Sequence, residues 1–262
     1  MASFFRFLRY ARLGLHLAEG LLTVLLVFPV VGVGWRERRM VAWSRRILSI
    51  LGVHQEVRGV VSGTEGGNLL LVANHVSWVD IYLLLSLMPL RFVSKAEVRE
   101  WPLIGWLAEQ TGTLFLERGR RADAARVNQH IGDVLAAGGV VGFFPEGTTT
   151  DGTELKHFHT SLLEPAVLAG SSVQPVALRY RRPDGRPSLA PAYTGDATMG
   201  QTLKAMAEEG AIIGEVLFLP PISAIGRNRR ELARLAEEAI RGALGFGTGG
   251  REPGTSSGPP GA

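Results

Sequence analysis

Apolar and polar residues follow three different patterns along the chain. Residues 20–35 form the longest run without a charged side chain, and residues 35–51 repeat apolar side chains at helical spacing with arginines largely off that face. Short apolar runs then alternate with amphipathic segments, until Gly, Ser, Thr and Pro dominate at the end. The pattern predicts two membrane-anchoring helices over residues 1–52, a folded domain over residues 53–244 and a disordered tail over residues 245–262.

The central domain alternates predicted strands with predicted helices. The apolar runs predict strands at residues 55–61, 69–73, 90–94, 113–116, 140–144, 172–180 and 215–219. The amphipathic segments predict helices at residues 78–88, 122–137, 162–169 and 229–244. This alternation indicates an α/β sheet with helices on both faces. Pro175 lies inside one predicted strand, and a proline there favours an edge position.

The N-terminal apolar run is short for a membrane crossing. A crossing needs about 20 apolar residues, whereas the charge-free run contains 16 and includes Pro29. A secretory signal is a poor match, because arginines follow at once and no small-residue cleavage site is present. We therefore predict two helices that dip into one leaflet. A single crossing and a pair of core helices in a soluble protein are the alternatives.

Charge is concentrated in the same region. The chain carries a net charge of +4, but its first 46 residues hold eight Arg and two Glu, which is +6 locally and leaves −2 for the rest. A cationic end beside apolar segments favours anionic lipid headgroups. Nucleic acid is excluded as a partner because the central domain lacks a basic stripe with interleaved aromatic residues. The chain has no Cys, which excludes disulfides and a cysteine nucleophile.

One predicted strand runs directly into a histidine. His75 follows the apolar residues 69–73, so it lies at the carboxyl end of a strand, where open α/β sheets bind their ligands. Asp80 lies five residues further on, about 140° away on a continuous helix, so the two can meet only if the chain turns near Ser77. Histidine oriented by a carboxylate is a general base. The alternative is that His75 caps a strand and Asp80 caps a helix.

Two further strands also end in polar residues. Arg118 follows the strand at 113–116, and its guanidinium could bind a phosphate or carboxylate. Glu146, Gly147 and Thr148 follow the strand at 140–144, in a turn whose amides could face an anion. Glu146 could bind an acceptor hydroxyl or Arg118. Taken singly, a solvated arginine and an ordinary turn are the alternatives.

Together, these segments resemble the glycerolipid acyltransferase family, which includes 1-acylglycerol-3-phosphate acyltransferase. The resemblance covers residues 69 to about 180 and rests on four blocks in the family's order, at residues 75–80, 112–118, 144–148 and 173–176. It implies a mixed sheet flanked by helices, as in glycerol-3-phosphate acyltransferase, with the helix pair as membrane anchor. Phosphatidate-forming members usually carry Arg where this chain has Thr149. Asp151, Gly152, His157 and His159 are similar to the branch that includes lyso-ornithine lipid acyltransferases.

The resemblance also implies a reaction. A fatty acyl group would pass from an acyl-coenzyme A or acyl-carrier-protein thioester to the free hydroxyl of a lysolipid, 1-acylglycerol-3-phosphate giving phosphatidate. Lyso-ornithine lipid or another lysophospholipid is the alternative acceptor. His75 would be the base and Asp80 its partner, with Arg118, Glu146, Gly147 and Thr148 binding substrate. No metal or bound cofactor is expected, and the catalytic domain would face the cytoplasm at the inner membrane.

A metal-dependent hydrolase is the alternative from another functional class. His157 and His159 are two residues apart, so on a strand both would lie on one face and could bind zinc together with His75 and Asp80. The order of the four blocks favours the acyltransferase.

Overall fold

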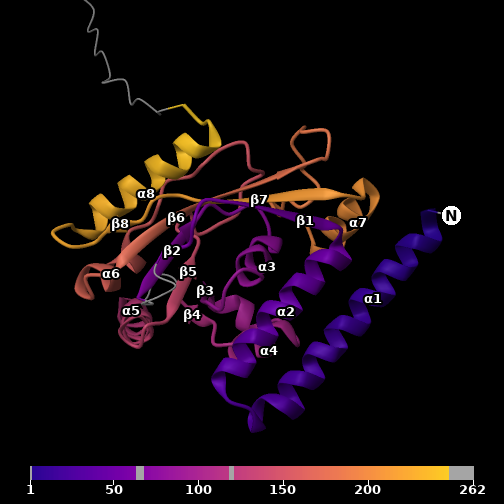
Figure 1. Ribbon diagram of the computed structural model, residues 1–262, viewed down its shortest axis with the longest axis horizontal. Helices are drawn as coiled ribbons and strands as arrows, with labels where there is room; N and C mark the ends of the chain where they lie inside the picture. Colours follow the sequence, from indigo (N-terminus) through magenta and orange to yellow (C-terminus); the bar gives the residue numbers. More distant parts are fainter. Residues whose placement is uncertain (1, 63–67, 118–120, 248–262) are drawn as a thin grey trace, which may run out of the picture.

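Two antiparallel N-terminal helices lie beside an α/β domain that is built on one large sheet (Figure 1). The computed structural model describes residues 2–62, 68–117 and 121–247. The predicted tail therefore lies outside the described residues, apart from its first three positions.

The N-terminal helices form a hairpin. The chain runs through α1 (Ala2–Leu22), a π-helical turn η1 (Thr23–Val27), a 3-10 turn η2 (Phe28–Val30) and α2 (Val33–Leu51). The segment Arg6–Val30 is long and apolar enough to cross a bilayer by length and composition. It is longer than the charge-free run because it extends towards the N-terminus through Glu19 and His16 as far as Arg6. Pro29 stands in the 3-10 turn, next to the point where the chain reverses.

Two polar residues of α1, His16 and Glu19, have partners on α2. His16 Nε2 lies 3.0 Å from the carbonyl oxygen of Trp43, while Trp43 Nε1 donates to the carbonyl oxygen of His16 at 3.2 Å. The two rings stack with their centroids 4.6 Å apart. Glu19 forms an ion pair with Arg39. Because these groups pair across the hairpin, they do not have to be exposed to lipid individually. The reversal agrees with helices that dip into one leaflet, which stays a prediction.

The sheet has eight strands in the order β1-β7-β6-β2-β5-β3-β4, with β8 paired to β6. Parallel ladders join β1 to β7, β2 to β5 and β6, and β3 to β4 and β5, whereas β6 runs antiparallel to β7 and β8. The predicted mixed sheet is therefore confirmed. The strands are β1 (Val53–Arg58), β2 (Leu69–Ala73), β3 (Arg91–Lys95), β4 (Leu114–Leu116), β5 (Val140–Phe143), β6 (Ser172–Arg181), β7 (Ile212–Phe218) and β8 (Ile222–Ser223).

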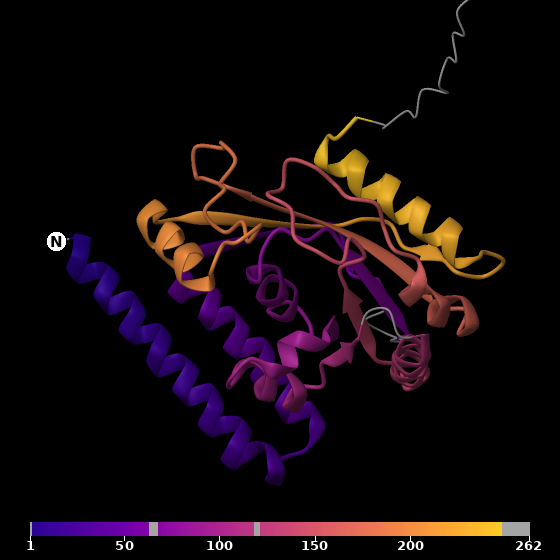
Figure 2. The ribbon, with the colours of Figure 1, turned by 180° about the vertical axis from the view of Figure 1, so that it is seen from behind.

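The central strand β2 separates two hydrophobic cores. Its five residues are all buried, and successive side chains enter opposite cores, as the period of a strand requires. One core is completed by α2, α3 (Val79–Leu85) and α7 (Met199–Glu209). The other is completed by α5 (Arg121–Ala136), α6 (Glu164–Leu168) and α8 (Arg229–Leu244). The helices lie on both sides of the sheet in both views (Figures 1 and 2), which confirms the predicted layers.

The predicted edge position of the proline-containing strand is wrong. β6 lies inside the sheet, between β2 and β7. Pro175 is tolerated there because β7 pairs from Val176 onward and β8 pairs only with Ser172 and Val173. The missing amide of Pro175 thus falls between the two antiparallel ladders and interrupts neither. The pattern also missed α4 (Ile104–Gln110), α7, the 3-10 turn η3 (Ala96–Glu100) and the two-residue strand β8. The helix predicted at residues 162–169 is divided between the 3-10 turn η4 (Ser161–Leu163) and α6.

Candidate active site

His75 lies at the carboxyl end of β2, in the middle of the sheet. The preceding residue fixes this position. Asn74 is buried, its Oδ1 accepts from the amide of Leu178 at 2.7 Å, and its Nδ2 donates to the carbonyl oxygen of Leu178 at 2.9 Å. The side chain therefore replaces a backbone pair and binds the end of β2 to β6. Thr150 closes the other side, because its amide donates to the carbonyl oxygen of His75 at 2.8 Å.

The chain turns between His75 and Asp80 and brings the two side chains together. Ser77 makes this turn, since its hydroxyl accepts from the amide of Val79 and its carbonyl accepts from the amide of Asp80. Helix α3 then begins at Val79. As a result, His75 Nδ1 lies 2.9 Å from Asp80 Oδ2. The geometry is that of an imidazole that donates from Nδ1 to a carboxylate and leaves Nε2 as the basic nitrogen.

Asp80 is fully buried and accepts four hydrogen bonds. Besides His75, its Oδ2 accepts from the amides of Val76 at 2.8 Å and Ser77 at 2.9 Å. Its Oδ1 accepts from the hydroxyl of Tyr180 at 2.6 Å. Burial, together with the Asp80 carboxylate, raises the pKa of Tyr180 well above its ordinary value, so the phenol remains a donor. These donors hold a buried charge that would otherwise be costly, and they fix its orientation.

An aromatic stack holds the imidazole ring from one side. The ring of His75 lies 3.8 Å from that of Phe144, centroid to centroid, at an interplanar angle of 5°. Phe144 stacks in turn on Phe92 of β3 at 5.6 Å. The His75 side chain keeps 19% of its surface exposed, in contrast to Asp80 at 0%. The imidazole is therefore oriented by its surroundings and remains accessible to a substrate.

Glu146 supports the site through the backbone. Its carboxylate is buried, with Oε1 accepting from the amide of His75 at 2.8 Å and Oε2 from the amide of Lys156 at 2.9 Å. Burial raises the pKa of Glu146, while these two amides act in the opposite direction. Both oxygens are thus engaged by the protein. Glu146 joins the loop at residues 74–78, which we call the histidine loop, to the segment after β5. The sequence pattern did not indicate this role.

The neighbouring substrate-binding candidates form a turn after β5. The amide of Gly147 donates to the carbonyl oxygen of Phe144 at 3.0 Å, and Gly147 has a positive φ of 66°, which favours glycine. Thr148 follows directly in this turn. Arg118 lies outside the described residues.

A segment that the sequence did not single out covers one side of the turn. The amide of Tyr193 donates to the carbonyl oxygen of Val76 at 3.0 Å, and the hydroxyl of Thr149 donates to the carbonyl oxygen of Tyr193. Thr149 therefore uses its side chain to hold this segment beside the histidine loop. Tyr180 was missed as well, because a strand tyrosine 100 residues from Asp80 carries no local signal.

His157, one of the histidines of the metal-site alternative, has its partner outside the candidate site. His157 is exposed, and its Nδ1 lies 3.0 Å from Glu237 Oε2 on α8. Within the ranges that the structure describes, no group of three or more His, Asp or Glu side chains could hold a metal ion.

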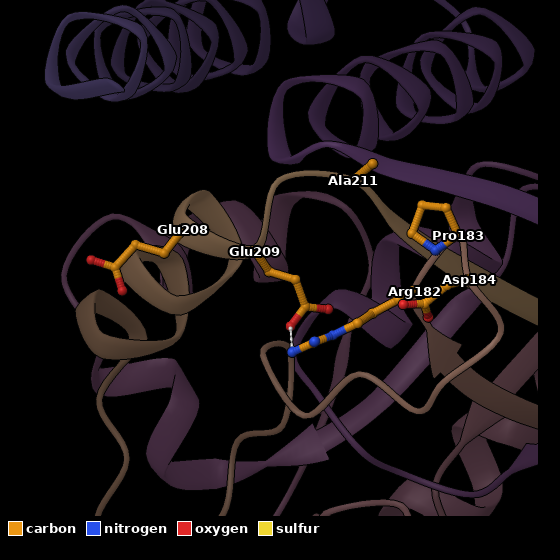
Figure 3. Close-up of a pocket in the computed structure, with 6 residues that line it drawn as sticks. All are labelled: Arg182, Pro183, Asp184, Glu208, Glu209 and Ala211. Carbon is orange, nitrogen blue, oxygen red and sulfur yellow. Dashed lines mark hydrogen bonds and ion pairs between the residues drawn. The ribbon is translucent and has the colours of Figure 1, made fainter. Parts of the chain in front are cut away.

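A separate polar pocket of about 480 Å³ lies at the end of α7 (Figure 3). Its lining includes Arg182 and Glu209, which form an ion pair of 3.1 Å, and none of the candidate site residues lines it. We therefore assign the chemistry to the surroundings of His75.

Comparisons with known proteins identify the family. The acyltransferase family model matches residues 54–179. The lyso-ornithine lipid O-acyltransferase of Pseudomonas aeruginosa is 45% identical over 217 residues, which cover 81% of this chain and 80% of that protein. The 1-acyl-sn-glycerol-3-phosphate acyltransferase of Neisseria meningitidis serogroup B is 35% identical over 158 residues, which cover 60% and 62%. The chain belongs to the acyltransferase family.

The fold agrees with this assignment. The solved structure of the 1-acyl-sn-glycerophosphate acyltransferase PlsC from Thermotoga maritima superimposes with a TM-score of 0.67, at 19% sequence identity, over 94% of this chain and 97% of that chain. The protein is an acyltransferase that acts on lysolipids. Its apolar N-terminal helix and its lipid-modifying relatives indicate association with a membrane.

Proposed function

We propose that the protein esterifies the free hydroxyl of lyso-ornithine lipid with a fatty acyl group from an acyl-carrier-protein or coenzyme A thioester. The similarity to the Pseudomonas aeruginosa protein, which extends over four fifths of both chains, carries this proposal. Thr149 supports it, because the position next to the Gly-Thr pair holds a hydroxyl that is bonded to the backbone rather than a cation for a phosphate. The second candidate acceptor is 1-acylglycerol-3-phosphate, which the similarity to the Neisseria protein supports.

His75 acts as the general base in the proposed mechanism. Its Nε2 takes the proton of the acceptor hydroxyl while that oxygen attacks the thioester carbonyl carbon. The ester C–O bond forms, the C–S bond breaks, and the imidazolium returns the proton to the leaving thiolate. Asp80 keeps Nδ1 protonated and stabilises the imidazolium charge. The acceptor hydroxyl is the nucleophile and the thioester supplies the activation, so this reaction needs no bound metal or cofactor.

The remaining candidate residues bind substrate or hold other parts of the site in position. We assign Glu146 to positioning, because both of its oxygens accept from backbone amides. Gly147 shapes the turn after β5, and we assign the amide of Thr148 to the thioester oxygen, on which negative charge develops during the reaction. Arg118 is assigned to acceptor binding by the resemblance of its block. Both donors are cytoplasmic thioesters, so we place the catalytic domain on the cytoplasmic side of the inner membrane.

Replacement of the base tests the mechanism. His75→Ala should lower turnover by at least about a hundredfold, the usual contribution of a general base, while circular dichroism shows an intact fold. Wild-type turnover in a folded His75→Ala protein would contradict the mechanism.

Replacement of Thr149 tests the acceptor. Each acceptor is supplied with both thioester donors, and products are measured by lipid mass spectrometry. A charge-assisted contact is worth about 1.5–3 kcal/mol, so Thr149→Arg should improve KM for lysophosphatidate by about tenfold or more. For zwitterionic lyso-ornithine lipid it should leave KM unchanged or worsen it, because the added cation repels the ammonium group.

The control is Thr149→Val, which removes the hydroxyl that holds Tyr193 but adds no charge. If wild-type protein made phosphatidate and no ornithine lipid, the proposed acceptor would be wrong. An equal change in KM for both acceptors would show that residue 149 does not face the headgroup.

A further inference from the structure

The turn between η3 and α4, together with the first turn of α4, exposes apolar side chains to solvent. Trp101 is 39% exposed, Leu103 62%, Ile104 39% and Trp106 36%. Single exposed apolar residues are ordinary on protein surfaces, but here two tryptophans, a leucine and an isoleucine are exposed within six positions of the chain. The catalytic mechanism does not use any of these four side chains. We refer to residues 101–106 as the tryptophan segment.

The fold holds this segment in an unfavourable conformation. Leu103 has a φ of 63° and a ψ of −46°, the geometry of a classic γ-turn, which is rare and strained. Backbone hydrogen bonds close the turn around it, from Ile104 to Pro102 at 2.7 Å and from Gly105 to Trp101 at 2.9 Å. A Cβ added at Gly105 would lie 2.1 Å from the carbonyl oxygen of Arg99, so the turn is also packed tightly against η3. A strained turn that directs leucine outward indicates an interaction at this surface.

The location of the segment indicates what it contacts. In both views, η3 and α4 lie toward the same end of the molecule as the turn between α1 and α2 (Figures 1 and 2). That turn is itself apolar and exposed, with Leu25 at 58%, Leu26 at 64% and Val30 at 81%. Two exposed apolar surfaces at one end of a lipid-modifying enzyme are suited to the same bilayer.

The chemistry of the surroundings also fits a lipid surface. Exposed Arg91 and Lys95 lie on β3, and the side chain of Arg99 is 61% exposed beside its ion-pair partner Glu109. Glu97, Glu100 and Glu109 balance these three cations, so charge alone does not identify the partner. Tryptophan is enriched at the boundary between hydrocarbon and water, and this preference, together with the exposed apolar turn at the same end of the molecule, favours a membrane interface over a protein partner.

We propose that the tryptophan segment is a second membrane-contact surface, which rests in the headgroup layer while the turn between α1 and α2 reaches deeper. The proposal rests on the membrane location of the proposed acceptor. Its consequence for catalysis follows from the stack described above. β3, which precedes η3 and the tryptophan segment in the chain, carries Phe92, which stacks on Phe144, and Phe144 stacks on His75. A bilayer held at this surface would orient His75 toward lipid acceptors.

Site-specific labelling tests the contact without any activity measurement. The chain has no Cys, so Leu103→Cys gives a single labelling site in the full-length protein for an environment-sensitive fluorophore. The control is Ile225→Cys, which is 73% exposed and lies next to β8. In vesicles of phosphatidylglycerol and phosphatidylethanolamine, the probe at residue 103 should shift to the blue. Lipids with a spin label near the headgroup should quench it, and the probe at residue 225 should not respond. Equal responses at the two positions would overturn the proposal.

An activity comparison supplies an independent test. Leu103→Asn keeps a side chain of similar size and branching and replaces the apolar group with a polar one. With acceptor in vesicles its rate should fall by about tenfold, the size expected when one leucine no longer enters the bilayer. With a short-chain acceptor in detergent its rate should stay at the wild-type level, as should that of Ile225→Asn in both assays. Equal losses of rate for Leu103→Asn in vesicles and in detergent would show that Leu103 supports catalysis without contacting a membrane, and would overturn the proposal. Inactivity toward lyso-ornithine lipid alone would contradict only the proposed acceptor.

Discussion

Tyr180 gives the sharpest test of how the site is organised. Its hydroxyl donates to Asp80 Oδ1 at 2.6 Å, and both residues are buried. Tyr180→Phe removes this single donor and leaves Oδ2 with its three hydrogen bonds, from His75, Val76 and Ser77. Because water cannot reach Asp80, the vacated oxygen has no replacement partner. The substitution therefore isolates the effect of one hydrogen bond on the orientation of the carboxylate.

The magnitude follows from the charge of the acceptor. A hydrogen bond to a charged group contributes about 1.5–3 kcal/mol, and each 1.4 kcal/mol corresponds to about tenfold in rate. If the full contribution is expressed in the transition state, kcat for Tyr180→Phe falls by about 10- to 100-fold. Asp80→Asn, which also disturbs the tautomer of His75, should cost more. KM should not change for either substrate, because the hydroxyl of Tyr180 points to Asp80 in the interior.

The assay is steady-state acyl transfer with purified protein in detergent, together with urea denaturation to measure stability. Tyr82→Phe is the matched control, because Tyr82 lies in α3 together with Asp80 but its hydroxyl is not among the four donors to Asp80. Like Tyr180, it is a protonated phenol, because burial raises the pKa of Tyr82 to about 12. Tyr82→Phe should retain wild-type kcat. If Tyr180→Phe were less stable but had wild-type kcat, the tyrosine would be structural only, and the reasoning would be refuted.

Two further substitutions test the supports of the site and of the hairpin. Glu146→Gln leaves one of the two backbone amides that donate to Glu146 without an acceptor and removes the charge from the other bond, so the free energy of unfolding should fall by about 1–3 kcal/mol in urea denaturation. An unchanged value would contradict the positioning role. Gly20→Leu should weaken vesicle binding in a flotation assay, because a Cβ there would lie 2.7 Å from Trp43 Nε1 and separate α1 from α2. Gly14→Leu, on the same helix with nothing within 4 Å, is the control, and equal binding by both variants would exclude this mechanism.

The strands of the domain were predictable because each is a short apolar run bounded by turn residues. The run at residues 69–73 matches β2 in its bounds, and the amphipathic segment at 229–244 matches α8. The sequence marked α8 clearly, since Asn228 caps its start and Gly245, with a φ of 76°, ends it. In contrast, α7 is preceded by a capping box at Thr198 and Gln201 that the apolar pattern does not register. α4 is a seven-residue helix among exposed apolar residues, so it has no amphipathic period to detect.

The candidate site was predictable only where the chemistry is local. His75 and Asp80 are five residues apart, and the turn that lets them meet could be anticipated from Ser77. Tyr180 could not be anticipated, because its contact with Asp80 depends on β6 lying beside β2. The same holds for Tyr193, which reaches the site through two backbone groups that carry no side-chain signature. Contacts that depend on strand order or on the backbone leave no pattern in a single sequence.

The hairpin and the catalytic residues are mechanically connected. The ring of Trp43 on α2 lies 5.8 Å from that of Tyr82 on α3, and Tyr82 lies 6.0 Å from Trp78, which stands between His75 and Asp80 in the chain. Arg45 on α2 adds a hydrogen bond of 2.8 Å to the carbonyl oxygen of Ser86, directly after α3. Because α2 packs on the helix that carries Asp80, the hairpin is held against the α/β domain by side-chain contacts. Under the proposed function, the orientation of the hairpin in the bilayer would fix the direction in which His75 meets a lipid hydroxyl.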